Sequence, residues 1–210
     1  MPNLTAKKLA LAGAALVLLG VALLMPWSDA LFAAHMGQHL LLIALAAPLL
    51  VLGGARVPLP PAVGWTLFVA VFLFWHWPAA FQWAALHPAA AVLELATILL
   101  AVMAFWSGVL DQGLNAGARA LMVMTAAVLT DLPGVIMLFA PSAICVMPHE
   151  NAAAFGLSAL EDQQLAGLLM WVPANLVFFA VATALFAQWI SGQRPDPAPT
   201  PASAHAHPSR

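Results

Sequence analysis

Two histidines stand four residues apart in the segment HMGQH, at positions 35–39, directly before the apolar run LLLIALAAPLLVLGG. Residues i and i+4 of an α-helix lie on the same face, about one turn apart. The imidazoles of His35 and His39 can therefore bind one metal ion together, or each can hydrogen-bond a neighbouring helix. We expect the first, because further metal-binding residue types occur nearby.

A second group of such residues lies in the stretch CVMPH. Cys145, Met147 and His149 place a thiol, a thioether and an imidazole at alternating positions, and residues two apart in extended backbone point the same way. Sulfur ligands select copper(I), and imidazole suits copper in either oxidation state. The alternative is that the cysteine and the methionine only pack against the membrane surface.

The composition indicates where these residues are held. The chain has 210 residues, of which 64% are hydrophobic and only 7% are charged. A soluble domain needs more charge than this to cover its surface, and runs of about 18 or more apolar residues indicate membrane spans. A net charge of -2 argues against nucleic acid as a partner, and a single cysteine excludes an internal disulfide.

The sequence predicts an all-α integral membrane protein, a bundle of six transmembrane helices formed by residues 1–192. The predicted spans are 8–26, 34–54, 62–77, 88–110, 117–140 and 159–189. We expect the first to be a retained anchor rather than a signal peptide, because its apolar run is long and ends in MPW. Residues 193–210 are rich in proline and are predicted to be a disordered tail.

The basic residues predict the orientation of the bundle. With six spans and a cytoplasmic N-terminus, every lysine and arginine falls on the cytoplasmic side, as membrane insertion favours; these are Lys7, Lys8, Arg56, Arg119, Arg194 and Arg210. Both termini are then cytoplasmic. The histidines outside the tail fall at the opposite, outer face, and they are His35, His39, His76, His87 and His149. His87, which precedes a proline, is expected to be a loop or capping residue.

Carboxylates within the apolar segments need a partner. Glu94 and Asp131 lie inside predicted spans, where an ionised side chain costs about 2.5–3.5 kcal/mol. Each is expected either to orient a metal-bound histidine or to be neutral and bonded to a neighbour. The sequence SALE is typical of a capping box that joins Ser158 to Glu161. Asp162, which follows it, is expected either to interact with the positive end of the helix dipole in the first turn or to orient a metal ligand.

The last span carries a spaced set of its own. Gln163, Gly167 and Met170 are at positions i, i+4 and i+7 and share a helix face. Gly167 permits a close helix approach, and Met170 offers a thioether. The predicted ligands for copper are His35, His39 and His76, with sulfur from Met170 or from the loop of Cys145, Met147 and His149. Around them we expect Asp131, Asp162, Glu94 and Gln163.

Three stretches, HMGQHLLLIALAAPLLVLG, HWP and EDQQLAGLLMWVP, together resemble the CtaG family of cytochrome c oxidase assembly factors. The matching positions are His35, Met36, Gln38, His39, His76, Pro78, Asp162, Gln163, Gly167, Met170 and Trp171. The resemblance implies a metallochaperone-like assembly factor of the bacterial inner membrane that catalyses no reaction. Its implied partners are the oxidase subunits, membrane lipid and a periplasmic copper carrier. The stretch CVMPH is not part of the shared pattern.

Two other functions fit the same residues. Histidines on facing helices, such as His39 and His76, can ligate a b-type haem in an electron carrier, although such carriers commonly hold a second haem near the inner face, where no span histidine falls. A metal or proton transporter could use Asp131 and Glu94. However, no polar residues continue that path into the cytoplasmic halves of the spans.

Overall fold

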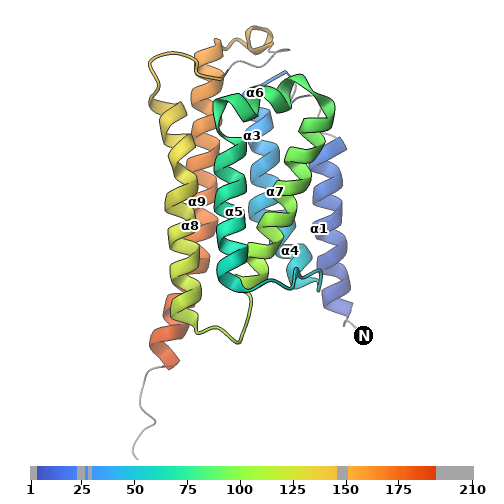
Figure 1. Cartoon of the computed structure of the whole chain (residues 1–210), viewed down its shortest axis with the longest axis vertical. Helices are drawn as coiled ribbons and strands as arrows, with labels where there is room; N and C mark the ends of the chain where they lie inside the picture. Colours follow the sequence, from blue (N-terminus) through green and yellow to red (C-terminus); the bar gives the residue numbers. More distant parts are fainter. Residues whose placement is uncertain (1–3, 23–26, 28–29, 146–150, 193–210) are drawn as a thin grey trace, which may run out of the picture.

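The protein is an all-α bundle in the computed structural model, which describes residues 4–22, 27, 30–145 and 151–192 (Figure 1). Five helical segments in these ranges are long and apolar enough to cross a membrane. They are α1 (Leu4–Ala22), the continuous segment of α3 (Phe32–Leu40), η1 (Leu41–Ala46) and α4 (Ala47–Leu52), and then α7 (Pro88–Val109), α8 (Ala116–Phe139) and α9 (Ala159–Gly192). A short 3₁₀ turn, η2 (Ala152–Phe155), precedes α9.

A bent pair of helices forms the sixth crossing if it is counted as one span. The pair consists of α5 (Pro61–Trp75) and α6 (Pro78–Leu86), which meet at 73°. The predicted third span, 62–77, therefore ends two residues beyond α5, and residues 78–86, which were left outside the predicted spans, are helical. The break occurs at Trp77, whose extended backbone is what a residue before proline prefers, while Pro78 starts the new helix at its first turn. The all-α membrane bundle is confirmed, with five or six candidate spans.

The crossings alternate in direction (Figure 1). Helix α6 lies across one end of the bundle, where α3 and α7 begin and α5 ends. The N-terminus and the last turn of α9 lie at the other end. Lys7, Lys8, Arg56 and Arg119 belong to elements or connections at that second end. The structure thus separates these basic residues from His35 and His76 along the bundle axis; which end faces the cytoplasm stays a prediction.

Small residues allow helix backbones to touch inside the bundle. A Cβ atom built on Gly167 of α9 would lie 2.6 Å from the carbonyl oxygen of Gly134 in α8, so the backbones of the two helices touch. The expected role of Gly167 is confirmed. A Cβ atom on Gly64 of α5 would lie 2.7 Å from the carbonyl oxygen of Ala104 in α7. Close backbone contact of this kind is how helices associate in membranes.

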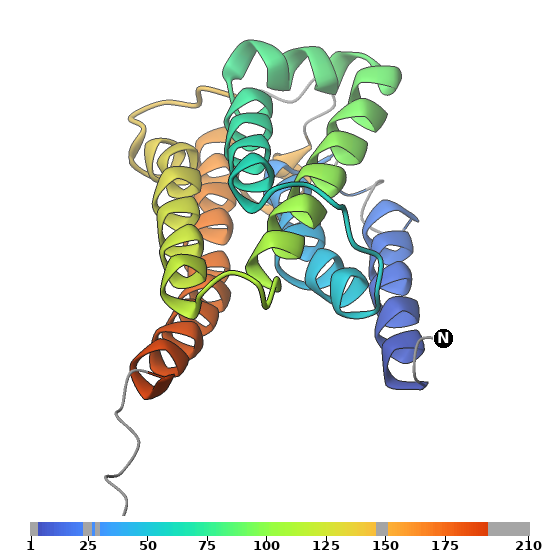
Figure 2. The same cartoon turned by 60° about the horizontal axis from the view of Figure 1, so that its bottom comes forward.

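The outer helices are less enclosed. Helix α1 stands at the edge of the bundle beside η1 and α4 (Figure 2). Helix α9 has 34 residues and is about 51 Å long at 1.5 Å per residue, whereas the hydrocarbon core of a bilayer is about 30 Å thick. Its C-terminal turns extend beyond the other helices (Figure 1).

Candidate metal centre

Three potential ligand atoms meet between α3 and α7. The Nε2 atoms of His35 and His39 lie 3.5 Å and 3.6 Å from Oε1 of Glu94, and all three atoms are within 4.8 Å of one another. A tetrahedral metal with bonds of about 2.1 Å to nitrogen and oxygen holds neighbouring ligand atoms about 3.4 Å apart. The two distances to Glu94 Oε1 therefore match the separation of neighbouring ligands around a first-row transition metal.

The cluster is buried and its polar atoms are unsatisfied. Glu94 is 1% exposed and His39 is 2% exposed, while the His35 side chain keeps 13% of its surface. Within the described ranges, His35 Nε2, both ring nitrogens of His39 and Glu94 Oε1 have no hydrogen-bond partner. Buried polar atoms without partners are costly. A bound ion would satisfy them, so the residues present fit a metal.

The N-terminus of α9 holds the histidine pair in place. The carboxylate of Asp162 accepts hydrogen bonds from the backbone N–H groups of Phe32 and Ala33, at 2.7 Å and 2.9 Å. These are among the first free N–H groups of α3, which its own N-cap residue does not satisfy. Asp162 thus fixes the start of the helix that carries His35 and His39, through the backbone rather than through an imidazole.

The remainder of α3 is held from two sides. The side-chain amide of Gln38 donates to the carbonyl oxygen of Gly20 in α1 at 2.7 Å. From Leu41, two residues after His39, the helix continues as the π-helical segment η1. Its Ile43 carbonyl accepts a hydrogen bond from Trp106 Nε1 of α7 at 2.9 Å. Short π segments in α-helices often accompany functional sites; here one changes the helical phase immediately below the histidine pair.

His76 lies on the other side of His39, across a small cavity of about 30 Å³. The ring centroids of the two histidines are 5.6 Å apart. Met36 and Met170 line the same cavity. The Nδ1 atom of His76 is 2.7 Å from the carbonyl oxygen of Phe72 and must donate to it, which leaves a lone pair on Nε2. The structure therefore splits the predicted set of three histidines, with two beside Glu94 and the third among thioethers.

Other predicted residues lie elsewhere. Asp131 accepts a hydrogen bond from the Asn175 side chain at 2.8 Å. Of the two roles expected for Asp131, this contact fits the one in which its carboxyl bonds to a neighbour. Gln163 donates to the carbonyl oxygen of Met137 at 3.1 Å and accepts from the N–H of Cys145, also at 3.1 Å. It thereby anchors the connection after α8 instead of facing the histidines.

The stretch CVMPH is described only in part. Cys145 is buried, and burial raises the pKa of its thiol. Among the His, Cys, Asp and Glu side chains that the structure describes, the only cluster with metal-ligand spacing is His35, His39 and Glu94, so Cys145 is not part of it. Met147 and His149 lie outside the described residues. Their predicted role as ligands stays a prediction.

Two features of the site were not found in the sequence. Met36 was not among the predicted ligands, although it lines the cavity with His39; the spacing i, i+3 between them was an available signal. Phe81 of α6 packs edge-on against the His35 ring, with centroids 5.6 Å apart. No spacing rule predicts this contact, because it depends on α6 folding across the end of the bundle.

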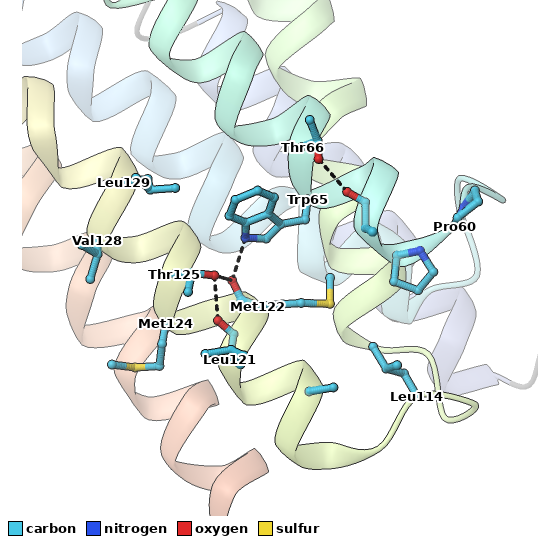
Figure 3. Close-up of a pocket in the computed structure, with 13 residues that line it drawn as sticks. Pro60, Trp65, Thr66, Leu114, Leu121, Met122, Met124, Thr125, Val128 and Leu129 are labelled. Atoms are coloured by element: carbon cyan, nitrogen blue, oxygen red, sulfur yellow. Dashed lines mark hydrogen bonds between the residues drawn. The ribbon is translucent and has the colours of Figure 1, made fainter.

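A second hollow, on the flank of the bundle between α5 and α8, has a different chemistry (Figure 3). This groove of about 1020 Å³ is lined largely by apolar side chains such as Leu121 and Val128. Its polar groups are satisfied by backbone, since Trp65 Nε1 donates to the Met122 carbonyl at 3.1 Å and Thr125 to the Leu121 carbonyl at 2.8 Å. Such a surface suits acyl chains.

The fold and the site define a class, the multi-span helical membrane proteins with a buried cluster of imidazoles and a carboxylate near one end of the bundle. The family model of the cytochrome c oxidase caa3 assembly factors (Caa3_CtaG) matches residues 54–192. The chain belongs to this family and is a cytochrome c oxidase assembly factor, which confirms the resemblance in its sequence. The match includes His76, Glu94 and Met170 but begins after His35 and His39. No curated protein and no solved structure matched the chain.

Proposed function

We propose that this assembly factor binds a copper ion at His35, His39 and Glu94 and aids its insertion into cytochrome c oxidase. The observation that carries the proposal is that three buried ligand atoms without hydrogen-bond partners lie close together. The Nε2 atoms of His35 and His39 are 3.5 Å and 3.6 Å from Glu94 Oε1. Copper is the cargo in this proposal. The protein binds and transfers it, and catalyses no reaction.

The donor set supports a transition metal over a hard cation. Two imidazoles suit copper, zinc, iron or nickel, whereas magnesium and calcium prefer oxygen ligands alone. The oxidase that the family assembles is a copper enzyme, and copper is therefore the ion we propose. Three protein ligands leave one position of a tetrahedral ion open, which an exchange with an incoming protein ligand requires.

The shape of the site supports release at one end of the bundle. His35 is the least buried member of the cluster, lies in the first turn of α3 and contacts Phe81 of α6. Glu94 is six residues into α7, about 9 Å below the start of that helix. With the basic end of the bundle in the cytoplasm, this opening faces the periplasm of a bacterial inner membrane. There a copper carrier and the oxidase subunits would meet it.

The experiment is metal analysis of the purified protein together with oxidase assembly in cells. His35→Ala/His39→Ala should lose bound copper and lower the copper content of the oxidase. The matched control is His87→Ala, since His87 is exposed and its ring bonds only to the Trp83 carbonyl, at 3.0 Å, among the contacts given for the described chain. Retention of wild-type copper by the double variant would refute the proposed site.

The haem alternative has less support. A b-type haem between His39 and His76 needs a slot of several hundred cubic ångströms or more, whereas the cavity between these rings measures about 30 Å³. The absorption spectrum of the purified protein tests it directly, because a bound haem gives an intense Soret band.

A further inference from the structure

We infer that the chain holds a second metal position, selective for copper(I), in the cavity between α3, α5 and α9. Its ligands are His76, Met36, Met170 and the imidazole of His39, which it shares with the position at Glu94. The inference rests on the proposed function, since it concerns the same cargo. It adds a ligand set that discriminates between oxidation states.

The first argument is the enclosed space. The cavity measures about 30 Å³, about the share of volume that one water molecule takes in the liquid. Met36 is 1% exposed and Met170 is 8% exposed, and they come from different helices, α3 and α9. Two thioethers and two imidazoles thus line, together with apolar side chains, a space for a single ion.

The second argument is the state of the ring nitrogens. His76 Nδ1 donates to the Phe72 carbonyl at 2.7 Å, so the lone pair is on Nε2, and in the described part of the chain that buried atom has no partner. The Phe72 ring stacks on the imidazole at 4.0 Å and fixes its plane. Among the described residues, neither ring nitrogen of His39 has a hydrogen-bond partner, and of the two only Nε2 is given within 4 Å of Glu94.

The third argument is charge. Imidazole and thioether are neutral ligands, and the side chains that line the cavity include no carboxylate; its other polar lining group is the Thr130 hydroxyl. Thr130 already donates to the Ala126 carbonyl at 2.9 Å. A neutral sulfur-containing set in an apolar cavity favours a soft monovalent ion. The position at Glu94, with an anionic oxygen, favours a divalent ion.

The two positions share His39 and are too close to be filled together. Two cations a few ångströms apart in an apolar interior repel strongly, so each chain should bind one ion at a time. Copper(I) then occupies the thioether position, and copper(II) or zinc(II) the carboxylate position.

The test is an anaerobic titration of the full chain in detergent with copper(I), using a chromophoric chelator as competitor, and a parallel titration with zinc(II). Met36→Leu/Met170→Leu removes both thioethers with little change in volume. It should weaken copper(I) binding by about tenfold or more, by analogy with the loss of supporting groups at metal sites, and leave zinc(II) binding unchanged. Glu94→Gln should do the reverse. The stoichiometry should be one ion per chain.

X-ray absorption of copper(I)-loaded wild-type protein keeps the test independent of whether a variant folds. Sulfur scattering from the bound copper supports the inference, and a spectrum of nitrogen and oxygen neighbours alone overturns it. Unchanged copper(I) affinity in the folded methionine variant overturns it as well. The proposed function fails separately. Suppose that copper(I) stays bound in His35→Ala and in Glu94→Gln and that the wild type binds no divalent ion. The thioether position would then be supported, and the carboxylate position of the proposed function would be refuted.

Discussion

The Nε2 atom of His39 on α3 lies 3.6 Å from Oε1 of Glu94 on α7, and both side chains are almost completely buried. His35 Nε2 approaches the same oxygen at 3.5 Å. The sequence placed Glu94 among residues that orient the ligands. In the proposed site this carboxylate would bind the ion directly, because a single oxygen lies 3.5 Å and 3.6 Å from the two imidazole nitrogens.

Glu94→Gln should therefore weaken zinc(II) and copper(II) binding by roughly 10–100-fold, which is what losing a group that supports a metal ligand typically costs. The substitution keeps the size of the side chain and replaces an anionic oxygen by an amide. Competition with a chelator of known affinity measures the change. Glu161→Gln is the control, since Glu161 is exposed and bonds to Ser158. Equal affinities in Glu94→Gln and wild type would mean that the carboxylate only pairs with the histidines.

Asp162→Asn should destabilise the protein by about 1–3 kcal/mol, because charge-assisted bonds to two helix N–H groups are lost or weakened. The amide nitrogen that replaces one oxygen cannot accept the bond from Phe32 or Ala33. Copper binding should fall in parallel, since His35 lies in the first turn of the same helix. Thermal unfolding in detergent gives the stability change.

The control for this variant is Asp111→Asn, at an exposed turn where Asp111 accepts a bond from the Gly113 N–H at 2.9 Å. An asparagine can still accept that bond, and exposed substitutions usually stay within about 0.5 kcal/mol. If Asp162→Asn were as stable as Asp111→Asn, the contact between α9 and the start of α3 would contribute little to the fold.

Asp131→Ala should leave copper binding intact and cost about 1 kcal/mol of stability, the usual net value of a hydrogen bond. Its partner is Asn175, 2.8 Å away on α9. A double-mutant cycle with Asn175→Ala isolates the interaction, and a coupling energy near 0.5–1.5 kcal/mol is expected. Loss of copper from the single variant, with the fold intact, would return Asp131 to the metal site.

The features of the structure that could be predicted depend on the sequence within a single helix. Hydropathy predicted the helical crossings, and the spacing of His35 and His39 placed them on one face. The capping box was also predicted, and Ser158 and Glu161 do bond reciprocally, at 2.8 Å and 3.3 Å. Each of these follows from residues within a few positions of one another.

The parts that were missed depend on which helix faces which. Periodicity defines a helix face but not its neighbour, so the contact of Glu94 with both histidines and the bond from Asn175 to Asp131 were not predictable from one sequence. Helix α6 was missed for a local reason. Pro78 was interpreted as the stop after the third span, whereas it occupies the first turn of α6, where proline is favoured.

Fusion of a reporter after Arg194 tests the orientation. The reporter should be active only in the cytoplasm, because Lys7, Lys8, Arg56 and Arg119 lie at the end of the bundle where α9 finishes. A second fusion at Gly156, in the turn that ends η2, should report the periplasm and serves as the matched control. The opposite pair of results would place the metal site at the cytoplasmic face and remove the periplasmic partners from the proposal.

Gly167→Ala should destabilise the bundle by about 1–3 kcal/mol, the usual cost of forcing atoms into a packed interior. The added methyl would lie 2.6 Å from the Gly134 carbonyl oxygen and 2.9 Å from the Leu138 nitrogen, both backbone atoms that cannot rotate away. Helix α8 must therefore move from α9, which carries Met170. Gly37→Ala is the matched control, because a Cβ there meets nothing within 4 Å and alanine favours a helix by up to about 1 kcal/mol. Thermal unfolding of the two variants should give shifts of opposite sign. A Gly167→Ala protein as stable as wild type would show that α8 and α9 can separate without cost.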